Sequence, residues 1–285
     1  MKKLFTLISL ALAFMQGNAL DYNNPSGNNY INEWGRLKLV GNQLCSESGN
    51  PIQLRGWSTH GSWFKYCYDD KGDFEKMKNQ GANMARIAQY VTEGDGVDKN
   101  WVKNCIDFCA QLDMYCIVDW HLSYFGDPNA TYYSYAETFF QNISAYVKSK
   151  GYNHVLYEIC NEAFQDVDGD PHSVAEQYGV WNWIKTYTNK VLPKIKTNDP
   201  DAIVIVGTPQ WSEALEFALT DPLDEQGMNV MYSFHFYAGD QEQYLGALSA
   251  ATAFMPVFVS EWGGSEKNYF DSFNADVSNK LIQVC

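Results

Sequence analysis

The sequence predicts an α/β fold in which a barrel of parallel strands is covered by helices. Two observations carry this prediction. Apolar runs bounded by turn residues alternate with segments of helical period, and the runs are apolar almost without interruption, as in strands buried on both faces. Seven such units in one domain favour a closed barrel over an open, doubly wound sheet. The predicted strands are Ile52–His60, Ala82–Tyr90, Tyr115–His121, Val155–Phe164, Ala202–Thr208, Met228–Tyr237 and Pro256–Gly263.

Other segments fit the same architecture. Residues 36–54 predict a short hairpin, with turn residues at Gly41-Asn42 and at Gly49-Asn50-Pro51. Two helical segments show the period well, with apolar stripes at Trp101, Cys105, Cys109 and Leu112 and at Val180, Ile184, Tyr187 and Val191. No Gly-rich phosphate loop of the dinucleotide or Walker type follows the first strand, which disfavours a nucleotide-binding sheet.

The N-terminus has the three-part layout of a secretory signal peptide. A basic start at Lys2 and Lys3 is followed by an apolar run to Met15 and by small residues up to Ala19. The apolar run is shorter than the roughly 20 residues that span a bilayer. We therefore expect residues 1–19 to be a signal peptide and the product to be secreted, extracellular or periplasmic. Residues 20–285 contain no Ser/Pro/Thr-rich linker and predict a single catalytic domain.

The end of the chain bears on the completeness of the barrel. The sixth strand begins near Met228 and the seventh near Pro256, and the same spacing places an eighth strand close to residue 288, beyond Cys285. The closing segment has helical period, with one stripe at Phe270, Phe273, Val277 and Leu281. We therefore expect the barrel to be truncated before its eighth strand, with the C-terminal βα unit missing.

Composition limits the possible partners. Acidic residues outnumber basic ones by 34 to 20, for a formal net charge of −14, which disfavours nucleic acid and anionic membranes and suits a neutral substrate. No later stretch is apolar enough to span a membrane. Aromatic residues make up 15% of the chain; most are expected in the core, and some offer flat faces for sugar rings. A monomer is expected.

The sequence predicts neither a metal site nor a cofactor. The seven cysteines leave the disulfide pattern open. Cys105 and Cys109 lie on an apolar helix face, where plain buried thiols are expected, and no histidine is near enough in sequence to complete a zinc site. In the stretch Asp166–Asp170 the glycine stands at the wrong position for an EF-hand, so a solvated loop is expected.

Polar and ionisable residues stand at the carboxyl ends of six of the seven predicted strands. In a parallel barrel these ends meet at one face, where active sites lie. Burial of such groups costs free energy unless partners are supplied, so their repetition predicts a functional site. The residues are His60, Arg86, Tyr90, Asp119, His121, Asn161, Glu162, His235, Tyr237 and Glu261.

The two glutamates carry the sharpest prediction. Glu162 and Glu261 end strands that lie across the barrel mouth from each other, so their carboxyls can converge. A retaining glycosidase needs two carboxyls about 5–5.5 Å apart. Arg86 would hold Glu261 ionised, and Tyr237 could donate a hydrogen bond to it. Asn161 is placed to contact a sugar hydroxyl, and His121 and His235 are expected to line the site beside the acid.

Seven motifs in order make the sequence resemble glycoside hydrolase family 5, within it the bacterial endo-β-1,4-glucanase (cellulase) branch. The resemblance covers residues 33–263. The motifs are Ile52-Gln-Leu-Arg-Gly-Trp-Ser-Thr-His60-Gly, Asn83-Met-Ala-Arg86 with Tyr90, Val118-Asp-Trp-His121, Tyr157-Glu-Ile-Cys-Asn161-Glu162, Val206-Gly-Thr-Pro-Gln-Trp211-Ser, Tyr232-Ser-Phe-His235-Phe-Tyr237-Ala-Gly and Val257-Phe-Val-Ser-Glu261-Trp-Gly.

This resemblance implies a (β/α)8 TIM barrel, hydrolysis with retention and no cofactor. It implies Glu162 as general acid/base and Glu261 as nucleophile, acting on internal β-1,4-glucosidic bonds of cellulose or related β-glucans. It also implies a sugar-binding cleft formed by His60, Trp63, Tyr90 and Trp211.

Two other interpretations stay open. Another family 5 specificity (mannanase, xyloglucanase or mixed-linkage glucanase) would keep the barrel and the catalytic pair and change only the loops that bind the substrate. A non-catalytic carbohydrate-binding barrel would have lost at least one catalytic residue, whereas every expected position from the first to the seventh strand is filled.

Overall fold

The computed structural model describes residues 29–60, 65–91, 96–122, 131–163, 174–223, 229–237 and 245–264. Four predictions lie outside these ranges: the signal peptide, Trp63, the loop 166–170 and the closing helical stripe from Phe270 to Leu281.

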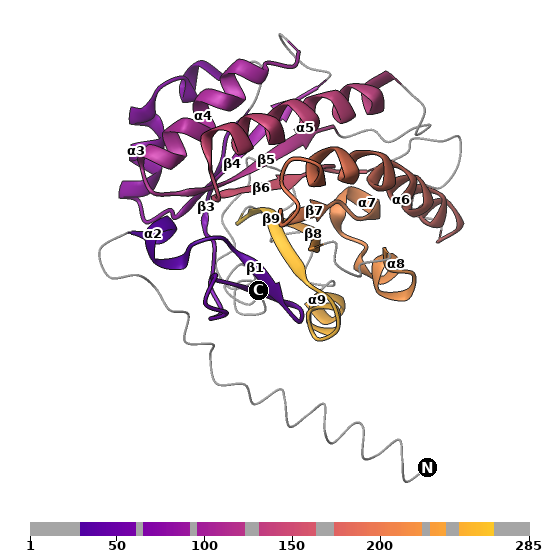
Figure 1. Cartoon of the computed structure of the whole chain (residues 1–285). Coiled ribbons are helices and arrows are strands. Elements are labelled where there is room, and N and C mark those ends of the chain that lie inside the picture. Colours follow the sequence, from indigo (N-terminus) through magenta and orange to yellow (C-terminus); the bar gives the residue numbers. More distant parts are fainter. Residues whose placement is uncertain are drawn as a thin grey trace.

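The centre of the fold is a parallel sheet of seven strands, which follow one another in chain order (Figure 1). They are β3 (Gly56–Ser58), β4 (Met84–Tyr90), β5 (Tyr115–His121), β6 (Val155–Glu158), β7 (Val204–Val206), β8 (Val230–Tyr237) and β9 (Val257–Gly263). The sheet curls so far that its last strand, β9, returns toward its first strand, β3. The contacts of Arg86 show this, because the guanidinium of this β4 residue contacts both Ser58 of β3 and Glu261 of β9. The predicted barrel of parallel strands is confirmed.

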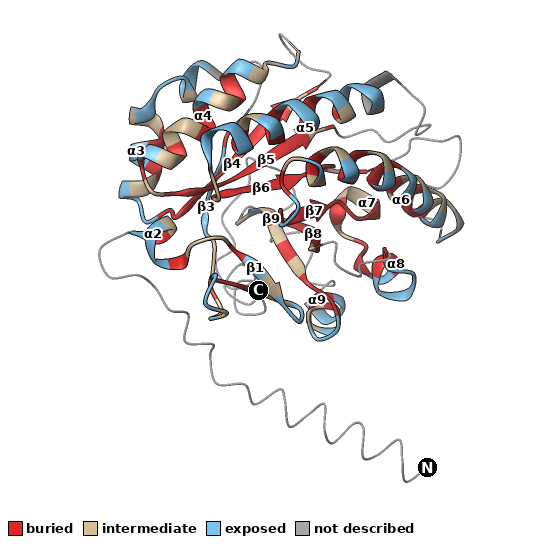
Figure 2. Cartoon of the chain, viewed as in Figure 1, coloured by how far each residue is buried: buried red, intermediate tan, exposed pale blue. Residues whose placement is uncertain are grey.

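Helices cover the outside of the sheet, and their apolar faces form the outer core layer with outward-pointing strand residues (Figures 1 and 2). They are α3 (Lys71–Asn79), α4 (Lys99–Gln111), α5 (Thr131–Lys150), α6 (Val174–Lys196), α7 (Pro209–Ser212), α8 (Leu215–Thr220) and α9 (Leu245–Thr252), with a 3₁₀ turn, η1 (Lys65–Tyr68), before α3. Both apolar stripes predicted from the sequence, on α4 and on α6, are buried.

Helix α4 shows how the sequence sets an element. Asp98 precedes it, and its carboxylate accepts hydrogen bonds from the backbone amides of Asn100 and Trp101, both at 3.0 Å. Such a cap satisfies two of the amides that a helix leaves unpaired at its start. The buried face of α4, which includes Cys105 and Cys109, then packs on the sheet.

The amino end of the barrel is closed by the segment before β3. Helix α2 (Tyr30–Trp34) and the antiparallel hairpin β1 (Lys38–Val40) and β2 (Gln43–Cys45) cover it, and the hairpin turns at Gly41, whose φ of +63° suits glycine. Beneath them lies the inner core layer, in which Trp34 packs against Tyr115. This confirms the predicted hairpin.

Most strands are shorter than predicted, and β3 and β6 fall furthest short of their predicted ranges. The hydrogen-bonded ladder of β3 covers only Gly56–Ser58. Before Gly56 the side chain of Asn83 replaces the ladder, because it accepts a hydrogen bond from the amide of Arg55 and donates one to the carbonyl of Gln53. Strand β6 ends at Glu158, so that Asn161 and Glu162 lie in the irregular segment that follows it.

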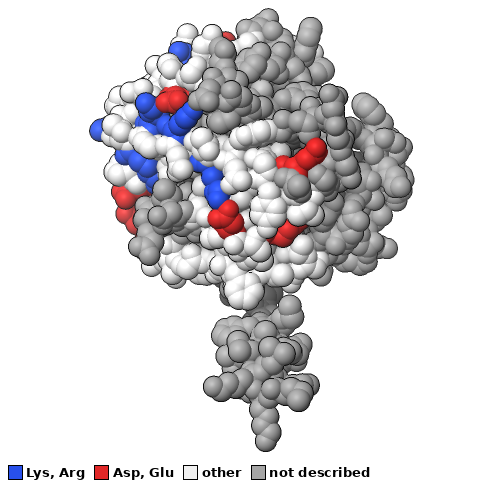
Figure 3. Space-filling model, turned by 90° about the vertical axis from the view of Figure 1, so that its right-hand side faces the viewer, with Lys and Arg blue, Asp and Glu red and all other residues white. Residues whose placement is uncertain are grey.

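The surface and the cysteines complete the description. None of the helices in the described ranges is long and apolar enough to cross a membrane. On the face shown in Figure 3, basic side chains gather on one side, and acidic side chains form small groups among uncharged residues. The six cysteines in the described ranges are free thiols; Cys67 is exposed and the other five are buried.

Candidate active site

The candidate site lies at the carboxyl end of the strands, on the side chains that point into the barrel. Alternate residues of a strand share a face, and β5 shows the consequence. Its inward positions, from the amino end, are Tyr115, Ile117, Asp119 and His121, whereas Trp120 points outward into the helix layer. The barrel interior is therefore apolar toward the amino ends of the strands and lined by ionisable side chains toward their carboxyl ends.

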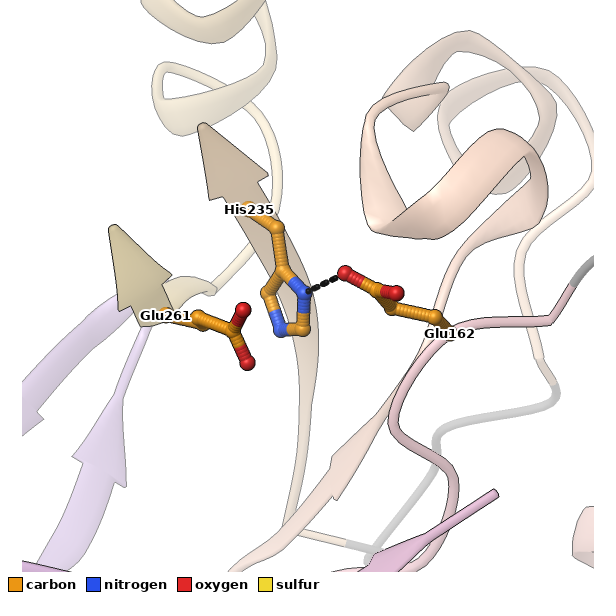
Figure 4. Close-up of side chains that lie close together, drawn as sticks. All are labelled: Glu162, His235 and Glu261. Carbon is orange, nitrogen blue, oxygen red and sulfur yellow. Dashed lines mark hydrogen bonds and ion pairs between the residues drawn. The ribbon is translucent and has the colours of Figure 1, made fainter. Parts of the chain in front are cut away.

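The two glutamates predicted as a pair do converge. Glu261 projects from β9, Glu162 from the segment after β6, and His235 of β8 lies between them (Figure 4). One carboxylate oxygen of each glutamate and one ring nitrogen of His235 all lie within 4.8 Å of one another. Residues almost 100 positions apart in the sequence thus share one small site.

Glu261 is held as an anion. Tyr237 donates a hydrogen bond of 2.7 Å to Oε1, and Arg86 donates one of 3.0 Å to Oε2. Burial raises the pKa of the Glu261 carboxyl, but the charges of His235 and Arg86 outweigh burial and lower that pKa to about 2. At neutral pH Glu261 therefore offers a carboxylate whose two oxygens are both oriented.

Arg86 organises the centre of the site and is buried, with 1% of its side chain exposed. The guanidinium contacts Glu158 at 2.6 Å, Asn161 Oδ1 at 2.7 Å, Asp119 at 3.0 Å and Glu261 at 3.0 Å. Burial lowers its pKa, but the charges of Asp119 and Glu158 outweigh burial, so the pKa is raised and the group stays charged. A buried charge of this kind is tolerated because opposite charges and acceptors surround it.

Glu162 has different neighbours from Glu261. About a fifth of its side chain is exposed (20%), and Oε1 lies 3.0 Å from Nδ1 of His235. Both ring nitrogens of His235 are used, because Nε2 lies 2.9 Å from the hydroxyl of Ser260. Burial lowers the pKa of His235, but its interactions with Glu158 and Glu162 outweigh burial and raise that pKa to about 10.

Three predicted residues form a stack of rings beside the glutamates. Tyr90 lies between His60 and His121, with ring centroids 5.0 Å from the first and 4.0 Å from the second and interplanar angles of 21° and 19°. His121 is anchored from below by Asp119, whose carboxylate lies 2.7 Å from Nδ1. The ends of β3, β4 and β5 therefore present one continuous aromatic surface.

Trp211 is placed by an unusual turn. Helix α7 contains three consecutive residues in the left-handed region, Gln210, Trp211 and Ser212, with φ values of 54°, 53° and 61°. The left-handed conformation costs an L-residue roughly 1–2 kcal/mol at each position, so contacts with other parts of the chain must stabilise this turn. The buried hydroxyl of Ser212 does so by donating a 2.7 Å hydrogen bond to the carbonyl of Asn161.

Sequence reasoning missed two residues of the site. Glu158 and Ser260 are buried beneath the glutamates, and Glu158 contacts Arg86 while Ser260 contacts His235. Glu158 could have been found, because it is a charged residue inside an otherwise apolar strand. For Ser260 the sequence holds no such signal.

Comparison with known proteins agrees with this geometry. The model of the family Cellulase (glycosyl hydrolase family 5) matches residues 45–284. Endoglucanase E-5 of Thermobifida fusca is 36% identical over 252 residues, which cover 84% of this chain and 50% of the relative. An endoglucanase of Clostridium saccharobutylicum is 38% identical over 264 residues, or 87% of this chain and 54% of the relative. The chain thus spans about half the length of these two relatives.

Solved structures give the same result. The catalytic domain of Thermobifida fusca endoglucanase Cel5A superimposes with a TM-score of 0.76 at 32% identity, covering 89% of this chain and 82% of that domain. A glutamate-to-glutamine variant of that domain, in complex with cellotetraose, gives the same values. The catalytic domain of alkaline cellulase K superimposes with a TM-score of 0.77 at 29% identity, covering 91% of this chain and 80% of that domain. By its sequence, its barrel and the residues at the barrel mouth, the chain belongs to glycosyl hydrolase family 5.

Proposed function

We propose that the protein is a retaining endo-β-1,4-glucanase, with Glu261 as nucleophile and Glu162 as general acid/base. The observation that carries the proposal is the approach of the two carboxylates, one oxygen of each within 4.8 Å of the other. Retaining glycosidases hold their carboxyls about 5–5.5 Å apart, whereas inverting ones leave about 6.5–9.5 Å for a water molecule.

In the first half of the reaction, a carboxylate oxygen of Glu261 attacks the anomeric carbon of a bound glucosyl unit. The glycosidic C–O bond breaks, and Glu162 gives its proton to the departing oxygen. In the second half, Glu162 takes a proton from water as that water attacks the same carbon, and the ester to Glu261 breaks. Two inversions return the β-configuration, and both glutamates end as they began.

The neighbours of Glu261 support its role as nucleophile. A carboxylate attacks only when ionised, and Arg86 and Tyr237 both stabilise the ionised form. Glu162 lacks such contacts with a cationic guanidinium and is paired with His235 instead. The two carboxyls therefore stand in different surroundings, as different roles require.

Asn161 supports the assignment of the sugar position. Arg86 occupies Oδ1 of its amide, which leaves Nδ2 as the group that faces a ligand. Nδ2 is buried and has no partner in the structure. A sugar hydroxyl beside the anomeric carbon would satisfy this donor, and the bond can strengthen in the transition state.

The substrate class is supported by the names of the relatives, which are endoglucanases, and by the cellotetraose complex of a related domain. The stacked rings of His60, Tyr90 and His121 lie beside the glutamates, where their aromatic and polar atoms can contact a neutral sugar. A reducing-sugar assay across carboxymethylcellulose, mixed-linkage glucan, xyloglucan and mannan tests the specificity. Preference for mannan or xyloglucan would overturn it while leaving the catalytic pair intact.

The role of the pair is tested with Glu261→Gln, which should lower turnover by several orders of magnitude while the protein stays folded. The matched control is Glu216→Gln, a substitution at an exposed glutamate of α8, which should leave the rate unchanged. Azide added to Glu261→Ala should restore cleavage and give a glycosyl azide of inverted configuration. Near-normal activity of Glu261→Gln would refute the proposal.

We also propose that the protein is exported and loses residues 1–19. The proposal rests on the basic, apolar and small-residue order of that segment. N-terminal sequencing of protein recovered from outside the cytoplasm should begin at Leu20, and a recovered protein that begins at Met1 would contradict it.

A further inference from the structure

Glu158 is a carboxylate buried under the active site that no step of the proposed mechanism uses. Its side chain is 0% exposed. Oε2 lies 2.6 Å from Nε of Arg86, and Oε1 accepts a 2.6 Å hydrogen bond from Ser260. Oε1 also lies 3.6 Å from Nε2 of His235, beyond direct hydrogen-bond distance. Glu158 therefore reaches both of the cations that contact the two catalytic glutamates.

Ser260 makes the connection to His235. The same hydroxyl that donates to Glu158 lies 2.9 Å from Nε2 of His235 and can accept the hydrogen of that nitrogen. On the other side of the ring, Nδ1 faces Glu162 at 3.0 Å. The contacts run without interruption from Glu158 through Ser260 and His235 to the acid.

A β-bulge puts Ser260 in this place. Phe234 pairs with Val259 and His235 pairs with Glu261, so Ser260 is an extra residue on β9 with no partner on β8. Strict alternation from the inward-facing Phe258 would point Ser260 into the barrel and Glu261 out of it. The extra residue lets both point inward, which is how bulges re-aim side chains beside active sites.

We propose that Glu158 is a positioning residue: it orients Arg86 toward Glu261 and, through Ser260 on the bulge, holds His235 as a cation oriented toward Glu162. The inference rests on the proposed function, since it assigns Glu158 a task in that same reaction.

The charges around these groups support the proposal. Glu158 faces Arg86 from β4, Asp119 from β5 and His235 from β8, while His235 also faces Glu162 and Glu261. Burial raises the pKa of Glu158, but Arg86 and His235 outweigh burial and lower it to about 2, so Glu158 stays ionised. A fixed buried anion on one side of the ring favours the doubly protonated imidazolium.

A cationic His235 determines which carboxyl oxygen of Glu162 carries the proton. Because Nδ1–H donates to Oε1 of Glu162, Oε2 is the oxygen on which the transferable proton sits. After that proton has left, the same N–H stabilises the carboxylate until water returns a proton. Loss of Glu158 would leave His235 free to give up a proton and to accept a hydrogen bond from Glu162, which turns the acid the wrong way.

Two buried serines allow a matched experiment. Ser260→Ala removes the hydroxyl that joins Glu158 to His235. Ser233→Ala removes a neighbouring hydroxyl, which lies 2.7 Å from Ser260 and 3.4 Å from Glu158. Both delete one buried oxygen, so a purely structural role predicts similar effects. Glu158→Gln, which keeps the shape and removes the charge, is the third variant.

The first readout is the proton-detected ¹⁵N spectrum of the histidine rings as pH is raised above neutrality, assigned by comparison with His235→Gln. In the unmodified protein both His235 nitrogens should keep their protons. In Ser260→Ala and Glu158→Gln the ring should deprotonate at lower pH, and in Ser233→Ala it should not. Should Glu158→Gln fail to fold, Ser260→Ala against Ser233→Ala decides alone.

The second readout is kinetic. Ser260→Ala should lower kcat on natural glucan by about tenfold or more with little change in KM, because a misaligned acid affects the bond-breaking step and not binding. The loss should be smaller on an aryl glycoside with a good leaving group. Equal spectra and equal kcat for Ser260→Ala and Ser233→Ala would overturn the inference. If the unmodified protein cleaves no glucan, the proposed function fails instead, and the spectra still test Glu158.

Discussion

At the scale of single residues, the two glutamates are distinguished by what each one touches. Glu261 lies between the guanidinium of Arg86 and the hydroxyl of Tyr237, which together favour its ionised form. Glu162 touches one ring nitrogen of His235 and is 20% exposed. The structure thus offers a permanent anion and a group free to exchange a proton with the substrate, and two predictions follow from this difference.

Glu162→Gln should separate the two halves of the reaction. An amide cannot protonate a leaving group, so hydrolysis of natural glucan should fall by about 10²–10⁴-fold. A dinitrophenyl glycoside needs little acid assistance and should still form the covalent intermediate, seen as a burst of dinitrophenol. Equal losses on both substrates would show that Glu162 is not the acid.

Tyr237→Phe should change the acid side of the pH–rate profile. The hydrogen bond from Tyr237 helps to lower the pKa of Glu261, which is about 2, so its loss should raise that pKa. Since the nucleophile must be ionised, the variant should lose activity at a higher pH than the unmodified protein as the solution is acidified. Tryptophan fluorescence recorded over the same pH range shows whether unfolding accounts for the loss. An unshifted acid limb would contradict the prediction.

The sequence predicted the residues at the strand tips because ionisable groups stand out after apolar runs. In the structure these side chains lie together at the carboxyl ends of the strands: Arg86, His121, Asn161, Glu162, His235, Tyr237 and Glu261. Glu158 was overlooked because the predicted strand continued to Phe164, which placed Glu158 inside the strand and not at its end. Ser260 could not have been predicted, since the alternation rule that locates inward residues fails at a bulge, and pairing partners decide where a bulge forms.

At the scale of elements, alternation was enough to predict the barrel but not the ends of its strands. The ends depend on side-chain competitors that the pattern does not show, such as the amide of Asn83, which replaces part of the β3 ladder. Likewise, no propensity predicts three left-handed residues in α7. A close contact explains why residue 207, shortly before α7, is a glycine. A Cβ at this position would lie 2.6 Å from the carbonyl oxygen of Cys160.

Ser212→Ala tests whether the left-handed turn is held by its link to Asn161. Removal of the hydroxyl leaves a buried carbonyl without that donor, which should cost about 1–3 kcal/mol of unfolding free energy. Ser149→Ala is the control, because it removes a similar 2.7 Å serine-to-carbonyl bond on the exposed surface of α5. That change should stay within about 0.5 kcal/mol. Urea unfolding of the two variants gives the comparison, and equal midpoints would show that the link does not hold the turn.

At the scale of the whole molecule, the buried charges should make stability depend on pH from both sides. Glu158 and Glu261 have pKa values of about 2 in the folded protein against 4.5 ordinarily, so the stability they supply is lost as pH falls from 4.5 toward 2. His235 has a pKa of about 10 against 6.5, so its contribution is lost as pH rises from 6.5 toward 10. Burial lowers the pKa of His154 to about 4 against 6.5, so this residue makes the folded protein less stable as pH falls below 6.5.

Stability should therefore be greatest near pH 6.5 and fall in both directions. Urea midpoints measured across the pH range give the curve. The fall between pH 6.5 and 8 is the more telling part, because it traces the charge of His235 before Lys196, whose pKa burial lowers to about 8, begins to titrate; it should be smaller in Ser260→Ala than in the unmodified protein. A curve that stays flat between pH 6.5 and 8 would contradict the assignment of His235 as a cation.

The buried Glu158 also bears on how many protons move when a glycosidic bond breaks. If both ring protons stay on His235, the only proton in flight is the one between Glu162 and the glycosidic oxygen or water. In mixtures of light and heavy water, the rate of the chemical step should then fall in a straight line with the deuterium fraction. A relay through the imidazole would move two protons at once and bend that line downward, so the shape of one plot reports on a carboxylate that never meets the substrate.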